Sequence, residues 1–180
     1  MTRRARAAAL AALLLGLAPA AASATTIVPI TTEELTRRSD EVLVATVRAS
    51  TSRWEHGLIV TDHELLVEAS IRGRTVVRST VFVRTPGGVV GRIAQTIPDA
   101  PMLEVGRSYL FFLSGGVGQV RYLAHLTAAV VPVESTARGE LVAQPSSSLL
   151  VDRSQSSPTA VAPPPMPLPT MLDLVRAVPR

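Results

Sequence analysis

The feature that most constrains the fold is a long alternation of apolar and polar residues near the middle of the chain. Between positions 59 and 71 the odd-numbered residues are largely apolar, whereas Asp62, Glu64 and Glu68 stand at even positions. Successive side chains of a β-strand point to opposite faces. The pattern therefore predicts one long strand whose carboxylates face water and whose His63 is turned toward the core.

Four other stretches have the β-branched and aromatic composition of strands. They are residues 40–50, 76–85, 107–116 and 120–134. Turn-forming residues separate them, including a polar hairpin loop predicted at 50–57 and the Pro-Gly-Gly that begins at Pro86. Residues 89–101 contain two prolines that prevent a regular ladder, so a crossing loop is predicted there. The chain is therefore predicted to be mainly β, with residues 138–143 as a further edge strand.

The two ends of the chain differ from this β-rich centre. Residues 1–24 have a basic start, an apolar run and an Ala-Ser-Ala, the three parts of a cleavable secretory signal. Thr31 and Glu34 have capping-box spacing, which predicts a short helix at 32–38. Serine and proline dominate later in the chain. We therefore expect a signal peptide at 1–24, a β domain at 25–143, a Pro/Ser-rich linker at 144–169 and a short helix at 170–180.

Charge and cysteine usage exclude several classes of partner. All eighteen basic residues are arginines, and loss of the signal would leave fifteen of them against fourteen acidic residues, a net charge of +1. A chain so close to neutrality lacks the basic surface that binding to nucleic acid requires. It has no cysteine, so disulfides cannot stabilise it. No later apolar run is long enough to span a membrane, and we expect a secreted or periplasmic protein cleaved near Ala24.

Two histidines and several carboxylates between Arg53 and Glu68 raise the question of a metal or acid–base site. A zinc site needs three or four converging ligands, and the chain has only His56, His63 and His125. The parity of the predicted strand separates His63 from its acidic neighbours. The chain also lacks cysteine, lysine and a Gly-x-Ser-x-Gly motif. The sequence therefore predicts no catalytic residue, no metal site and no cofactor.

Four segments resemble a known family in their order along the chain. They are "SDEVLVATV", "TDHELLVEASIRG", "VFVRTPGG" and "EVGRSYLFFL", and they are similar to the netrin-like module and to the inhibitory domain of tissue inhibitors of metalloproteinases. The run "TPGGVVGRIAQTIPDAPMLEVGRSYLFFL" resembles a group of exported bacterial proteins of unknown function. The resemblance covers about residues 31–133 and implies a small five-stranded, OB-like antiparallel barrel. It transfers no site residue, because the cysteine with which the inhibitors chelate zinc is missing here.

The candidate binding residues lie in the two predicted loops. Trp54 and His56 belong to the loop at 50–57, and Arg92, Gln95 and Asp99 belong to the crossing loop. An aromatic side chain with polar neighbours suits an anchor for a partner. We expect an exported, non-enzymatic binding or protein-interaction domain, whose partner is an exported protein or a cell-surface polymer.

Two alternatives stay open. A small-barrel hydrolase or metal-dependent enzyme would need His63, His125 and a carboxylate in one cleft. An assembly partner would be tethered through the Pro-rich tail. The positions of the histidines relative to one another test the first alternative.

Overall fold

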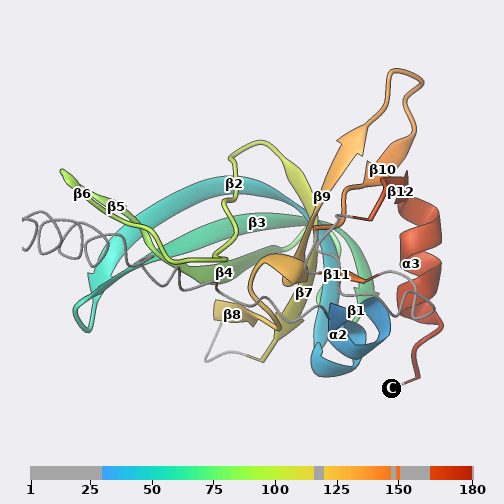
Figure 1. Ribbon diagram of the computed structural model, residues 1–180, viewed down its shortest axis with the longest axis horizontal. Coiled ribbons are helices and arrows are strands. Elements are labelled where there is room, and N and C mark those ends of the chain that lie inside the picture. Colours follow the sequence, from blue (N-terminus) through green and yellow to red (C-terminus); the bar gives the residue numbers. More distant parts are fainter. Residues whose placement is uncertain (1–29, 116–119, 147–148, 151–162, 180) are drawn as a thin grey trace, which may run out of the picture.

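The computed structural model describes residues 30–115, 120–146, 149–150 and 163–179, and most of this part of the chain is β structure, as the sequence predicts (Figure 1). The elements in chain order are β1 (Ile30–Thr31), α2 (Thr32–Arg38), β2 (Glu41–Glu55), β3 (Leu58–Arg72), β4 (Thr80–Pro86), β5 (Gly88–Val90), β6 (Ile93–Gln95), β7 (Ser108–Ser114), β8 (Val120–Leu123), the 3-10 turn η1 (Thr127–Ala129), β9 (Val130–Ser135), β10 (Leu141–Ala143), β11 (Leu149–Leu150), β12 (Met166–Pro167) and α3 (Leu168–Arg176).

One sheet of eight strands dominates the fold, in the order β12-β10-β9-β7-β2-β3-β4-β8. Strand β8 pairs with β4 and also with β7, so the strands β7, β2, β3, β4 and β8 form a ring. The β4–β8 pair is parallel, whereas β7 and β8 are antiparallel. The expectation of five antiparallel strands is therefore wrong in the number of strands and in the direction of one pair.

Residues 42–45 of β2 and 109–113 of β7 are apolar because both faces of these two paired segments are buried. On β7, Tyr109, Phe111 and Leu113 pack inside the ring with residues of β3 and β4. The alternate residues Leu110 and Phe112 pack on the other side, against residues of α2 and α3. A strand covered on both faces has a continuous apolar sequence, which explains the run "YLFFL".

The short N-terminal helix has the bounds and the N-terminal cap that the sequence predicts. Helix α2 runs from Thr32 to Arg38, and the backbone N–H of Glu34 donates to the side-chain oxygen of Thr31 at 3.1 Å. This bond satisfies one of the donors that the first turn of a helix leaves free. The neighbouring Ile30 and Leu35 are buried, so the cap joins the helix to the core.

The predicted loop at 50–57 is wrong, because β2 continues through this polar stretch to Glu55. Only His56 and Gly57 form the turn, with φ values of +49° and +82°. Two positive φ values are typical of the tight type I′ hairpin turn. Strands β2 and β3 therefore project together as a long curved arm, whose tip lies at the left of Figure 1 beside the β5–β6 hairpin. The β2 half of this arm lacks the apolar alternation of β3, and polar cross-strand pairs such as Ser52 with Thr61 and Arg53 with Asp62 join the two strands.

Three other boundaries differ from the sequence prediction. Strand β4 begins at Thr80, and Val76 and Val77 before it are exposed. The crossing loop at 89–101 contains most of a small hairpin, β5–β6. The single strand predicted at 120–134 is two strands, because β8 leaves the end of β7 to reach β4. The chain must then turn through η1 before β9 can pair with the first half of β7.

The C-terminal segment belongs to the folded core. Strand β12 pairs with β10, and α3 begins at Leu168, within the stretch 144–169 that we expected to be a linker. Along α3 and just after it, Met171, Val175 and Val178 are buried. This side of the helix packs on the apolar cluster that includes Phe112. Within the described residues, no helix is long and apolar enough to cross a membrane.

Candidate functional site

A hollow of about 340 Å³ lies between the inner face of strands β2, β3 and β4 and the crossing loop that follows β4. Its polar lining comes from the three strands and from Gln95 and Thr96. Apolar residues of the crossing loop form the opposite side. The lining residues are Ser50, Ser52, Thr61, His63, Thr85, Pro86, Gly87, Gly88, Val89, Ala94, Gln95, Thr96, Ile97, Ala100, Pro101, Met102 and Leu103.

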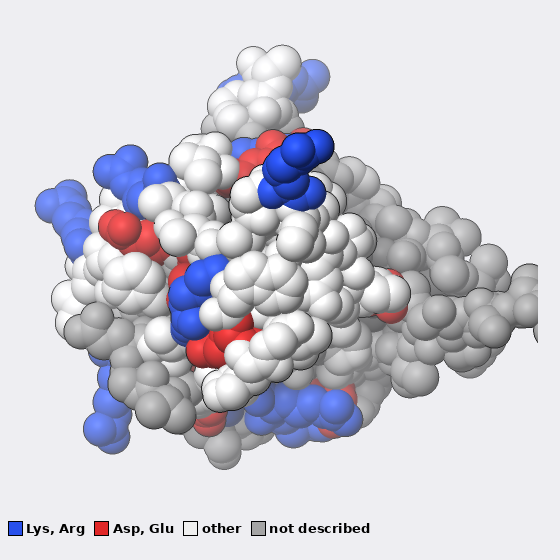
Figure 2. Space-filling model, turned by 90° about the vertical axis from the view of Figure 1, so that its left-hand side faces the viewer, with Lys and Arg blue, Asp and Glu red and all other residues white. Residues whose placement is uncertain are grey.

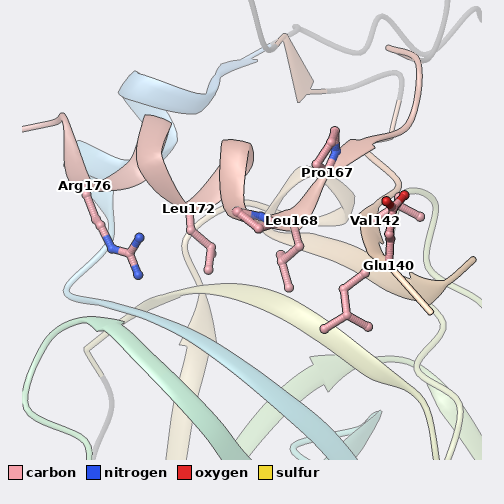
Figure 3. Close-up of a pocket in the computed structure, with 8 residues that line it drawn as sticks. Glu140, Val142, Pro167, Leu168, Leu172 and Arg176 are labelled. Carbon is pink, nitrogen blue, oxygen red and sulfur yellow. The ribbon is translucent and has the colours of Figure 1, made fainter. Parts of the chain in front are cut away.

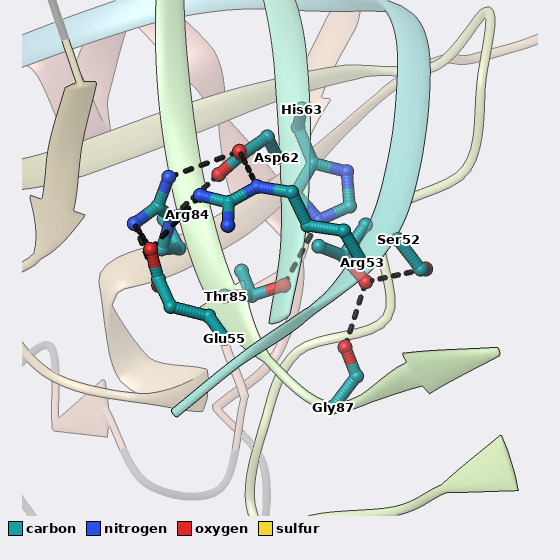
Figure 4. Close-up of polar contacts among 9 residues, drawn as sticks. Ser52, Arg53, Glu55, Asp62, His63, Arg84, Thr85 and Gly87 are labelled. Carbon is teal, nitrogen blue, oxygen red and sulfur yellow. Dashed lines mark hydrogen bonds and ion pairs between the residues drawn. The ribbon is translucent and has the colours of Figure 1, made fainter. Parts of the chain in front are cut away.

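His63 lies at the centre of the polar floor. It is buried and points toward the interior, as its strand parity predicts. Its Nδ1 lies 2.8 Å from Ser50 Oγ. Its Nε2 lies 2.9 Å from Thr85 Oγ1 (Figure 4). A buried polar side chain requires such partners. The three residues come from three adjacent strands, so the sheet itself fixes their geometry.

A second polar pair continues the floor toward the tip of the arm. Ser52 Oγ lies 2.8 Å from Thr61 Oγ1, and the Thr61 hydroxyl donates to the carbonyl of Gly87 at 2.7 Å. The backbone of Gly88 passes so close that a Cβ there would collide with both hydroxyl oxygens. The backbone N–H of Val89 donates to Ser52 Oγ at 3.3 Å. These contacts connect the crossing loop to the floor.

Burial lowers the pKa of His63 to about 4 from its ordinary value of 6.5, so the imidazole is neutral at neutral pH. A neutral imidazole has one donor and one acceptor nitrogen. Thr85 is buried, and among the described residues its hydroxyl has one hydrogen-bond partner, His63. Ser50, by contrast, is exposed, so its hydroxyl can reach water. A buried hydroxyl hydrogen without a partner costs about 1–3 kcal/mol. We therefore assign the Thr85 hydroxyl as donor to Nε2, and the Nδ1–H of His63 as donor to Ser50.

The carboxylates of the same stretch face outward and pair with arginines. Arg84 Nε lies 2.6 Å from Asp62 Oδ1, and its Nη1 lies 2.8 Å from Glu55 Oε2 (Figure 4). Arg53 contacts the same two acids at 3.3 and 3.0 Å. The hydrogen bond from Arg84 lowers the pKa of Asp62 below its ordinary value. This network accounts for two of the acids that suggested a metal site.

We expect Asp62→Ala to lower the free energy of unfolding by about 1 kcal/mol, because it removes the main partner of a partly buried arginine. Glu64→Ala on the same face is the matched control and should change the free energy by less than about 0.5 kcal/mol. Urea denaturation of the two variants measures the difference. Equal effects of the two substitutions would show that the Arg84–Asp62 pair contributes nothing.

The stability of the protein should fall as the pH is lowered from about 6.5 to about 4, in part because of His63. In this window the unfolded chain binds a proton at His63 that the folded protein does not bind, so protonation favours unfolding. Above the window neither state is protonated there, and His63 adds no pH dependence. The loss from this residue approaches about 3 kcal/mol at the lower end.

Urea denaturation between pH 7 and pH 4 measures this effect. His63→Gln should flatten the stability curve relative to the unsubstituted protein, since glutamine does not titrate. Parallel curves for the two proteins would contradict the assignment of His63 as a buried neutral imidazole.

The predicted binding residues separate into three places. Gln95 lines the hollow, and its Oε1 accepts the backbone N–H of Ile59 at 2.6 Å. Trp54, His56 and Arg92 lie at or beside the hairpin turns and are exposed. Asp99 does not line the hollow; it has φ +61° and its carbonyl accepts the hydroxyl of Thr127. The structure thus brings one of the five residues to the hollow.

His125 does not line the hollow with His63. Burial is the main cause that lowers its pKa, and Nδ1 has no hydrogen-bond partner within the part of the chain that the structure describes. Among those residues, no group of three or more histidines and acids could hold a metal ion. The described residues therefore do not provide the cleft that the enzymatic alternative requires.

Sequence reasoning missed Ser50, Ser52 and Thr85. Strand β2 contains a bulge at Arg48. Val47 pairs with Leu65 and Ala49 pairs with Glu64, so Arg48 has no partner on β3. The inward positions therefore pass from Val47 to Ser50 instead of Ala49. Thr85, which pairs with Thr61 across the sheet, could have been found from strand parity once β4 was aligned with β3.

The tip of the arm and the neighbouring β5–β6 hairpin expose several apolar side chains. On the two hairpins, Trp54 is 48% exposed, Leu58 55%, Val89 61% and Ile93 54%. Figure 2 shows this end of the molecule, where most of the described surface facing the viewer is uncharged and acidic and basic groups adjoin near its centre. We call these four residues the tip patch.

A second hollow of about 630 Å³ lies between α3 and strands β10 and β12 (Figure 3). Its lining is mostly apolar and includes Leu141, Val142, Leu168 and Leu172, with Arg176 near one end. A specific ligand site needs a few polar groups that fix orientation. The hollow under the crossing loop has more of them and is the better candidate site.

Comparison with known proteins adds no site residue. No protein-family model and no curated protein matches this chain.

Proposed function

We propose that the protein is an exported, non-enzymatic interaction domain that contacts an exported protein through its tip patch. The proposal rests mainly on the exposure of Trp54 and Leu58 at the tip of the arm and of Val89 and Ile93 on the β5–β6 hairpin. Trp54 shares a face of the arm with Ile59, whereas Leu58 pairs with Glu55 on the other face, so the exposed apolar side chains surround the tip of the arm and a partner could contact it from either side. Tryptophan is also enriched among the residues that dominate binding energy.

The arrangement of strands supports an OB-type barrel as the framework. The ring β7-β2-β3-β4-β8 has five strands, and the tip patch lies on the β2–β3 hairpin of the ring and on the separate β5–β6 hairpin. An OB fold is a partly open five-stranded barrel that binds ligands with its strand faces and end loops. This framework agrees with the resemblance to the netrin-like module that the sequence carries.

A photo-reactive amino acid placed at Ile93 tests the proposed contact. It should cross-link to a defined partner in the exported fraction of the native host, and the additional substitution Trp54→Ser should reduce the yield. The same probe at Val76, which is 70% exposed in the β3–β4 connection, is the matched control. Equal cross-linking from both positions, or none from position 93, would contradict the proposal.

The contact between Ser50 and His63 is the feature that most favours the alternative, a small-barrel hydrolase. A catalytic serine needs a base that accepts its proton and a group that orients that base. Here the tautomer set by Thr85 places a hydrogen on the nitrogen that faces Ser50, and the pKa of about 4 makes His63 a weak base. The geometry therefore favours a binding role.

Export is proposed from the signal-like residues 1–24, which lie outside the described residues. Terminal sequencing of the protein from its host should find a chain that begins near Thr25. A full-length product in the cytoplasm would contradict export without bearing on the tip patch.

A further inference from the structure

We propose that the hollow beneath the crossing loop binds a neutral, hydroxyl-rich ligand, namely one or two residues of an uncharged saccharide. Its volume of about 340 Å³ falls at the lower end of the range for small-molecule sites. The inference goes beyond the proposed protein contact, because it concerns the hollow and not the tip patch. Either one can fail without the other.

The lining of the hollow favours an uncharged ligand. Among the described residues that line it, none is aspartate, glutamate or arginine. The ion pairs of Arg84 with Asp62 and Glu55 involve outward-facing side chains of the arm. An ionic ligand would lose its hydration in the hollow without gaining a counter-charge, which is costly. A neutral ligand does not incur this cost.

The floor offers hydrogen-bonding groups that remain free after the internal bonds are formed. In the chain from Thr85 through His63 to Ser50, each group donates to the next, so the Ser50 hydroxyl hydrogen stays available at the exposed end. Ser52 donates to Thr61, and Thr61 donates to Gly87, which leaves one free lone pair on each hydroxyl oxygen.

These free groups comprise a donor at Ser50 and acceptors at Ser52 and Thr61. A saccharide hydroxyl both donates and accepts, so adjacent hydroxyls of one sugar can satisfy both kinds of group. Bonds along such a chain also polarise one another, which strengthens the terminal donor.

The side of the hollow that faces this floor is apolar. It includes Ile97, Pro101, Met102 and Leu103 from the crossing loop. Met102 is 91% exposed, so it lies at the rim where a ligand would cover it. A sugar ring has hydroxyls along its edge and C–H groups on its faces, and therefore matches a hollow with one polar and one apolar side.

A peptide fits this hollow less well. Peptides that add to a sheet use the backbone groups of an edge strand. The hollow instead presents side-chain hydroxyls on the face of three paired strands. Glycine at position 88 keeps these hydroxyls close to the crossing loop, where a side chain would fill the space.

Titration of the isotope-labelled protein with cellobiose, maltose and N,N′-diacetylchitobiose up to ~10 mM tests the proposal by NMR. At least one of these probes should shift the backbone amides of Gly87, Gly88 and Val89. Digalacturonate is the charged control and a short neutral peptide is the control for the other ligand class. Neither should shift these amides at the same concentrations.

Ser50→Ala and Ser52→Ala should each weaken saccharide binding by about tenfold, the loss expected for one hydrogen bond of about 1.4 kcal/mol. Ser135→Ala, on an exposed residue of β9, is the matched control and should leave binding unchanged. Melting curves confirm that each variant is folded. Cross-linking from position 93 should not change in these variants, which separates this test from that of the tip patch.

Three results would overturn the proposal. They are the absence of amide shifts with all three neutral probes, equal binding of digalacturonate or of the peptide, and unchanged saccharide affinity in both serine variants.

Discussion

Phe112→Ala should lower the free energy of unfolding by about 3–5 kcal/mol. Phe112 is fully buried on β7, on the side of the sheet that packs with residues of α2 and α3. Truncation removes a large apolar side chain and leaves a cavity that its neighbours cannot fill completely. Packing interactions must stabilise this chain without disulfides, because it has no cysteine.

Phe82→Ala is the matched control, because Phe82 lies on β4 and is only partly buried. Its loss should be about 1–2 kcal/mol, in proportion to the smaller apolar area removed from water. Chemical denaturation of both variants measures the difference. A loss below about 1 kcal/mol for Phe112→Ala would contradict the two-sided burial of β7.

A chain that ends at Pro165 should fail to fold cooperatively. This truncation removes α3 and the buried side chains of Leu168, Met171, Val175 and Val178. At about 1.5–3 kcal/mol for each buried apolar side chain, the loss is about 6–12 kcal/mol. That range approaches the whole stability of a typical domain, about 5–15 kcal/mol.

A point substitution tests the same packing more mildly. Met171→Ala should cost about 2–5 kcal/mol, whereas Leu174→Ala, at a position 37% exposed on the same helix, should cost much less. Thermal melting followed by circular dichroism measures both. A truncated chain that melts like the full-length protein would show that α3 only rests on the surface.

Parts of this fold are predictable because a local pattern determines them. The alternation along β3 gives its inward face and the direction of His63, and both are confirmed. The spacing of Thr31 and Glu34 gives the start of α2. The apolar run of β7 indicates burial, although only the structure shows that its alternate residues enter two separate cores.

The remaining features depend on pairing between distant segments, which no local pattern determines. The polar stretch from Ser50 to Glu55 is a strand because β3 pairs with it through hydroxyl and ionic side chains. The break between β8 and β9 exists because β8 must reach β4. In the candidate site, Gln95 could be named from the sequence, whereas Ser50 needed the register of β2.

The irregularity at Arg48 also bears on how the protein avoids aggregation. Strand β2 pairs with β7 only as far as Thr46, so beyond that point one edge of the arm has no neighbouring strand in the eight-stranded sheet among the described residues. An open strand edge is a template for another chain, and bulges and charged side chains are the usual protection. The bulge at Arg48 interrupts the edge where it opens, and Arg53 places a second charge on the same strand. Two copies of the protein should therefore resist joining edge to edge along their arms.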